Sequence, residues 1–137
     1  MMGALEDGLK KNSENNKTGG IMKTVDKPWG REIWWAHAKG KYMGKTLEIN
    51  DGHRLSLQLH RQKDETIYVL SGRLTLFYSE QKDGRLNEKI LEEGEAFRVR
   101  PFMIHRFSAQ HGDVTLLEVS TDFPDDVVRL EDDFGRE

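Results

Sequence analysis

From Trp29 onward the chain consists of short stretches in which apolar and polar residues alternate, separated by turn-forming residues. Alternation with a period of two is typical of β-strands that bury one face. Glycine-containing turns separate these stretches, as at Asn50-Asp51-Gly52 and Glu92-Glu93-Gly94. The predicted strands cover residues 32–37, 42–50, 54–60, 66–70, 74–79, 86–91, 96–100, 104–109 and 114–120. This pattern predicts an all-β antiparallel sandwich or barrel, with one short helix in the tail at residues 125–134.

The first 21 residues differ from the rest, because they are rich in Asn, Lys, Gly and Glu and contain almost no large apolar side chains. Such a composition contributes little to a core. We therefore predict a mobile N-terminal arm at residues 1–21, followed by one barrel domain at residues 22–137. We also hypothesise that Met22 is the natural start of the protein.

Charge and cysteine content narrow the functional classes. The chain has 21 basic and 24 acidic residues and a net charge of -3, which gives no electrostatic case for binding nucleic acid or a membrane surface. The absence of cysteine excludes disulfides, thiolate metal sites and cysteine nucleophiles. No apolar stretch is long enough to span a membrane or to form a signal region. We expect a cytoplasmic protein.

The strand predicted at residues 54–60 carries candidate metal ligands. Gln58 and His60 are two residues apart and therefore point to the same side of a strand. Glu65 follows after a tight turn, and His105 lies in the strand predicted at residues 104–109. An amide oxygen, two imidazoles and a carboxylate that converge from separate strands suit a divalent transition metal with exchangeable positions left open.

The opposite face of the same strand bears Leu55, Leu57 and Leu59. If Gln58 and His60 line a pocket, these leucines need cover from another sheet, from the N-terminal strands or from a second copy of the chain. This pattern favours a homodimer.

Two motifs resemble those of the cupin superfamily. The spacing Gly52-x5-Gln58-x-His60-x4-Glu65-x6-Gly72 resembles the first cupin motif, with glutamine in place of its usual first histidine. The stretch Gly94-Glu95-Ala96-Phe97, followed by His105, resembles the second motif. Together with Lys27-Pro28-Trp29-Gly30 and the tail at residues 128–136, these motifs are similar to the type II phosphomannose isomerases.

The resemblance implies a single-domain cupin, that is, a double-stranded β-helix or jelly-roll barrel. It also implies a metal held by Gln58, His60, Glu65 and His105. The metal is commonly zinc in that family, with manganese, iron, cobalt and nickel as alternatives. The implied reaction interconverts mannose 6-phosphate and fructose 6-phosphate.

Three basic residues are candidates for contact with a phosphorylated sugar. Arg54 lies on the predicted pocket face, and a guanidinium is well shaped for phosphate. Lys45 and Arg129 fall on family-like positions, and they are candidates for phosphate contact or charge stabilisation. We therefore predict catalytic roles for Arg54 and Arg129 and substrate binding by Arg54 and Lys45. The sequence does not identify the base that moves the proton.

The chain departs from the family where further histidines and a His-Trp pair usually flank the glutamate. It has Arg61, Gln62, Thr66 and Ile67 at these positions. These departures favour an alternative, a cupin that binds a metal or a sugar without turning it over. A third interpretation is a metal-dependent cupin oxygenase, which would require a redox metal.

Overall fold

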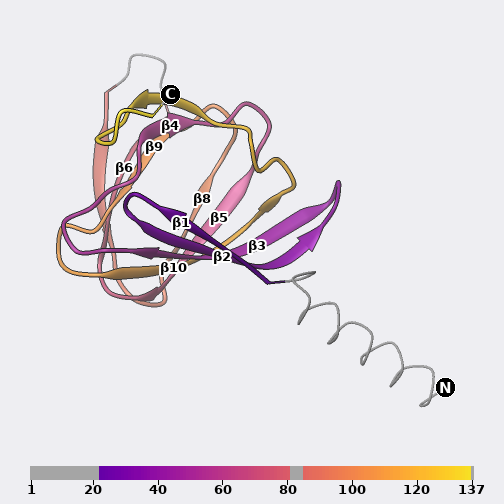
Figure 1. The fold of residues 1–137 in the computed structure, drawn as a ribbon. Coiled ribbons are helices and arrows are strands. Elements are labelled where there is room, and N and C mark those ends of the chain that lie inside the picture. The colour runs from indigo at the N-terminus through magenta and orange to yellow at the C-terminus, as the bar shows by residue number, and fades with distance from the viewer. Residues whose placement is uncertain (1–21, 81–84, 137) are drawn as a thin grey trace.

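The computed structural model describes residues 22–80 and 85–136, and it arranges them in two antiparallel sheets that face each other (Figure 1). In spatial order, the six-stranded sheet contains β1 (Lys23–Lys27), β2 (Gly30–Ala38), β3 (Tyr42–Ile49), β10 (Val114–Thr121), β5 (Glu65–Ser71) and β8 (Ala96–Val99). The five-stranded sheet contains β11 (Val128–Glu131), β4 (Leu57–Leu59), β9 (Ile104–Ser108), β6 (Leu74–Ser79) and β7 (Asn87–Leu91). The prediction of an all-β fold is confirmed.

The inward-facing positions of the six-stranded sheet change from apolar to polar along the strands. Leu116 of β10 lies opposite Leu47 of β3, and both side chains belong to the apolar core. Two residues further along β10, Glu118 lies opposite Lys45, and both are buried. Glu65 begins β5 at the same end of the sheet. Strand register therefore gathers the buried charges at one end of the space between the sheets.

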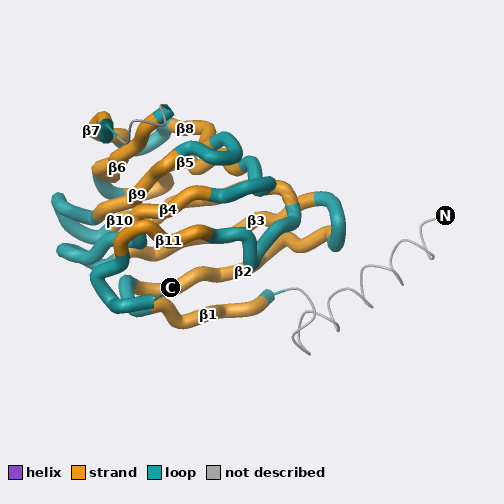
Figure 2. Tube along the Cα trace, turned by 90° about the horizontal axis from the view of Figure 1, so that it is seen from above, coloured by secondary structure: helices purple, strands orange, loops and turns teal. Residues whose placement is uncertain are grey.

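The prediction of a helix at residues 125–134 is wrong, because the tail forms strand β11 instead. Val128 pairs with Leu59 and Arg129 with Gln58, so β11 extends the edge of the five-stranded sheet beside β4 (Figure 2). The backbone groups at the edge of a sheet need partners, and the tail supplies them to β4. This long-range pairing outweighs the weak local preference of the tail for a helix.

The strand predicted at residues 54–60 is interrupted. Only Leu57–Leu59 are regular strand, while Arg54 makes an isolated bridge to Ser108. Leu55 turns into the apolar core, and Leu57 is also buried within a single chain, with 9% of its surface exposed. Leu55 and Leu57 are thus covered within one chain and no longer argue for a second copy, whereas Leu59 is only half-buried. The homodimer remains a prediction.

Two further predictions concern an N-terminal arm and the absence of a membrane-spanning segment. The arm predicted at residues 1–21 lies outside the described residues. Within residues 22–80 and 85–136, no helix has the length and apolar character needed to cross a bilayer.

Candidate metal centre

Three potential metal ligands converge at the polar end of the space between the sheets. His60 follows β4, Glu65 opens β5, and His105 lies in β9. One ligand atom from each can be chosen so that all lie within 4.8 Å of one another. All three side chains are buried, and His105 has no exposed surface. Two imidazoles and a carboxylate form a donor set that suits a divalent transition metal.

Backbone hydrogen bonds orient both imidazoles. Nδ1 of His60 lies 2.6 Å from the carbonyl oxygen of Asp126, and Nδ1 of His105 lies 2.9 Å from that of Met103. A carbonyl oxygen can only accept a hydrogen bond, so each Nδ1 carries the hydrogen and each neutral ring presents an unprotonated Nε2. Nε2 of His105 is buried without a hydrogen-bond partner, and it lies 3.5 Å from Glu65. An orphaned acceptor beside a carboxylate is the arrangement that a metal ion satisfies.

Gln58, the fourth predicted ligand, also reaches this region. It pairs directly with His105 across β4 and β9, which places both residues on the same face of the sheet. Together with His60 and Glu65, it lines a cavity of about 80 Å³. The structure therefore brings three of the four predicted ligands into one group and places Gln58 on the wall of the adjoining cavity.

Lys63 and Glu118, which the sequence analysis did not identify, form ion pairs beside Glu65. The ammonium of Lys63 lies 2.8 Å from Glu65 and 3.3 Å from Glu118. Burial alone would lower the pKa of Lys63, but the two carboxylates outweigh it and raise the pKa well above its usual range. Burial would raise the pKa of the Glu65 carboxyl, but the ammonium of Lys63 holds this pKa below its usual range.

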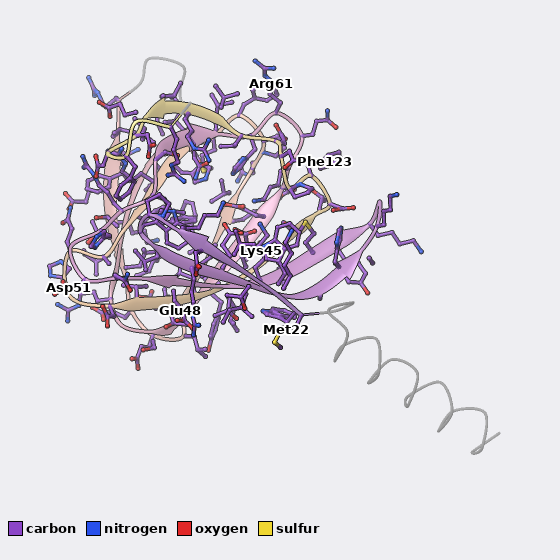
Figure 3. The ribbon with its side chains drawn as sticks, in the orientation of Figure 1. Met22, Lys45, Glu48, Asp51, Arg61 and Phe123 are labelled. Carbon is purple, nitrogen blue, oxygen red and sulfur yellow. The ribbon has the colours of Figure 1, made fainter. Side chains whose placement is uncertain are left out.

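The ion pairs continue along the cavity wall. Lys45 lies 3.9 Å from Glu118 and 3.4 Å from Glu32. Lys45 reaches the interior between the two sheets, whereas Arg61 stands at the edge of the molecule (Figure 3). Negative and positive side chains thus alternate along the cavity wall, from Glu65 at one end to Glu32 at the other.

Comparison with known proteins identifies the family. A model of the family described as "Cupin domain" matches residues 46–120, more than half of the chain. The chain belongs to the cupin domain family. The predicted cupin fold is thereby confirmed, and no curated protein matches the chain.

Several solved structures share this cupin fold. The capsular polysaccharide assembling protein CapF from Staphylococcus aureus has a TM-score of 0.71 at 14% identity, over 80% of this chain and 34% of that chain. Oxalate decarboxylase from Bacillus subtilis has a TM-score of 0.70 at 14% identity, over 80% of this chain and 30% of that chain. KdgF from Halomonas sp. has a TM-score of 0.64 at 18% identity, over 75% of this chain and 88% of that chain. This cupin therefore spans about one third of the length of CapF and of oxalate decarboxylase.

The predicted substrate residues occupy two different places in the cupin. Lys45 and Arg129 line the cavity next to His60 and Glu65. Arg54 does not line it, because its guanidinium binds both carboxylate oxygens of Asp133 at 2.7 and 2.9 Å. The side chain of Arg54 is also 40% exposed. Arg54 thus binds the tail rather than facing the metal ligands.

Asp126, in the tail, fixes the loop that carries His60 and Lys63. Its carboxylate accepts hydrogen bonds from the backbone N–H groups of Arg61, Gln62 and Lys63 at 2.6 to 3.0 Å. Its own carbonyl holds Nδ1 of His60. The tail therefore positions the metal centre although it contributes no ligand to it.

The burial of both histidines predicts a pH dependence of stability. Burial, as the largest cause, lowers the pKa of His60 and of His105 from 6.5 to about 4. Between these pH values the unfolded state binds protons that the folded state does not. We expect the free energy of unfolding of the metal-free cupin to fall by about 3 kcal/mol per histidine as the pH drops from about 6.5 to about 4. Below about pH 4 this contribution levels off.

Urea denaturation in the presence of a chelator, repeated across this pH range, measures the effect. The His105→Gln variant should show a shallower dependence on pH, because one of the two buried imidazoles is gone. Equal slopes for the wild type and the variant would contradict the assignment of the slope to these histidines.

Proposed function

We propose that this cupin is a metal-dependent sugar-phosphate isomerase that interconverts mannose 6-phosphate and fructose 6-phosphate. The observation that carries the proposal is the position of the His60, Glu65 and His105 group, which adjoins a cavity lined by three further carboxylates and four cations. The similarity of its motifs to the type II phosphomannose isomerases supplies the reaction. The absence of cysteine is consistent with a cytoplasmic location.

The isomerisation requires a polarised carbonyl, a base that moves a proton between adjacent carbons, and a site for the phosphate. A divalent metal, for which we propose zinc, would be held by Gln58, His60, Glu65 and His105 and would supply Lewis acidity at the carbonyl. Both imidazoles present an unprotonated Nε2 that can bind a metal, which supports this assignment.

Glu118 is our candidate for the base. It lines the cavity beside the metal centre but does not belong to the ligand group. Its carboxylate would take the proton from C2 of mannose 6-phosphate and return it to C1, while the proton of the C2 hydroxyl moves to the C1 oxygen. Lys63 remains protonated beside Glu118, so its ammonium would stabilise the negative charge that develops during the transfer.

The Glu118→Gln variant tests this role. We expect it to lower kcat for mannose 6-phosphate by about 100-fold or more, because general base catalysis typically contributes 10²–10⁴-fold. Metal content should stay unchanged. Glu48→Gln is a matched control, since Glu48 lies on the next strand but pairs with Arg31 away from the cavity. A coupled assay for fructose 6-phosphate and elemental analysis give the two readouts, and unchanged turnover in Glu118→Gln would exclude this base.

The alternative function is a cupin that binds a metal or a sugar without catalysis. It is favoured by the residues that replace the histidines of the family, since Arg61 and Gln62 are exposed and Ile67 is part of the apolar core. Wild-type protein with a full complement of metal that binds mannose 6-phosphate and forms no fructose 6-phosphate would establish this alternative.

A further inference from the structure

We propose that the anionic group of the substrate, a phosphate monoester, binds a cationic subsite formed by Lys27, Arg129 and Arg136. This inference rests on the proposed function and extends it, because it places the two ends of the substrate in two adjoining cavities. It also replaces Arg54, which the sequence suggested for this role.

A second cavity adjoins the first. It measures about 60 Å³, and Arg136 belongs to its lining but not to that of the first cavity. Five residues line both cavities, namely Lys27, Glu32, Leu55, Gln58 and Arg129. Gln58 is therefore shared by both cavities, and it lies opposite His105 of the metal centre. A ligand bound at the metal centre can extend past Gln58 toward the second cavity.

The two ends of this combined space carry opposite charge. Near the metal centre, the lining has three carboxylates, Glu65, Glu118 and Asp126, and two cations, Lys45 and Lys63, which leaves a negative surplus that suits a metal ion. The second cavity has three cationic side chains, Lys27, Arg129 and Arg136, and one carboxylate on its wall. Cations that outnumber carboxylates in a partly buried space attract an anion.

Arg136 is held in position to receive this anion. Its Nε and Nη2 donate to the carboxylate of Asp132 at 3.0 and 2.9 Å, and its backbone N–H donates to the same carboxylate at 2.6 Å. The side chain of Asp132 is only 3% exposed, so this support is rigid. A guanidinium has five N–H donors, so donors remain for a ligand after Asp132 is satisfied.

Lys27 is less tightly engaged. Its ammonium lies 4.0 Å from Glu32, which is beyond hydrogen-bond distance, and its side chain is 27% exposed. Glu32 accepts hydrogen bonds from Trp34 and Lys45 instead, at 3.0 and 3.4 Å. The three donor hydrogens of Lys27 are therefore available to an incoming anion.

The charge balance favours a phosphate monoester over a carboxylate. Around both cavities, the lining has five cationic side chains (Lys27, Lys45, Lys63, Arg129 and Arg136) and four anionic ones (Glu32, Glu65, Glu118 and Asp126). A divalent metal would increase this positive surplus. A dianionic phosphate group offsets it more fully than a monoanionic carboxylate does.

Calorimetric titration of the purified full chain with fructose 6-phosphate, fructose and glucuronate tests the subsite. We expect fructose 6-phosphate to bind at least about tenfold more tightly than either of the other two sugars, and Lys27→Gln and Arg136→Gln each to weaken it by about tenfold. Binding of fructose should be unchanged in both variants. Lys23→Gln and Arg98→Gln are matched controls, because Lys23 lies on the same strand and Arg98 forms a similar carboxylate pair with Asp64, and neither lines the cavities.

Three outcomes would overturn the proposal: equal affinity for fructose and fructose 6-phosphate, tighter binding of glucuronate, or full affinity in Lys27→Gln. If Arg136→Gln disrupts the tail, its loss of affinity would not identify the subsite. Lys27→Gln leaves the contact between Asp132 and Arg136 intact, so it tests the subsite separately. Failure of the isomerase proposal would look different. In that case fructose 6-phosphate would bind through Lys27 and Arg136, and the same protein would not convert it to mannose 6-phosphate.

Discussion

Replacing His105 with glutamine is expected to remove the metal from the protein. The wild type should hold about one divalent ion per chain, and His105→Gln should lower the affinity by more than about 100-fold, since loss of even an outer-shell partner of a metal ligand costs 10–100-fold. His60→Gln should have the same effect, because both rings present Nε2 to Glu65. Elemental analysis and competition with a chelator measure the loss, and isomerase activity should be lost with the metal.

His53 supplies a matched control for this experiment. Like His105, it places Nδ1 against the backbone carbonyl of the residue two positions earlier, at 3.0 Å from Asp51. It is exposed, however, and stacks on Phe134 instead of facing Glu65. His53→Gln should therefore retain the metal. A wild-type protein that neither contains metal nor binds added zinc would contradict the metal centre and the proposed isomerase together.

Replacing Lys63 with methionine is expected to destabilise the metal-free protein by about 3–5 kcal/mol. Lys63 is the closest cation to Glu65 and lies near Glu118 as well, and removing one partner of a buried ion pair leaves an uncompensated buried charge. Urea denaturation in the presence of a chelator measures the change. Lys41→Met, at an exposed turn position, should alter the free energy of unfolding by no more than about 0.5 kcal/mol.

A second substitution shows whether this loss comes from the excess of buried negative charge that Lys63→Met leaves, since Lys45 stays near Glu118 but not near Glu65. Adding Glu118→Gln to Lys63→Met removes one of the two charges left behind, so the double variant should be more stable than Lys63→Met alone. If Lys63→Met unfolds at the same urea concentration as the wild type, the ion pairs around Lys63 do not stabilise the folded protein.

The tail at residues 125–136 holds both of the sites on which these predictions depend. Asp126 holds the loop before Glu65, and Asp132 holds Arg136 at the second cavity. Strand β11 lies between these two residues in sequence and pairs with β4, which carries Gln58. A segment at the edge of the sheet thus positions the metal centre and the proposed anion subsite from opposite ends.

The local sequence was enough to predict the all-β class and the convergence of His60, Glu65 and His105. Strand alternation and turn residues are properties of neighbouring residues, so they can be recognised without knowledge of the fold. The cupin-like spacing of these residues then indicated which side chains would meet. Glu118 and Lys45 also left a signal, because each interrupts the apolar face of its strand, but that signal does not reveal a partner.

Only the tertiary structure determined which charges meet. The pairing of β3 with β10 places Lys45 opposite Glu118, and the pairing of β4 with β11 turns a predicted helix into a strand. The side-chain chemistry of Arg54 suits phosphate, yet the folded tail brings Asp133 to it, while Arg136 reaches the cavity. Such contacts join residues about 70 to 80 positions apart, and their energy depends on burial and register, which no local pattern specifies.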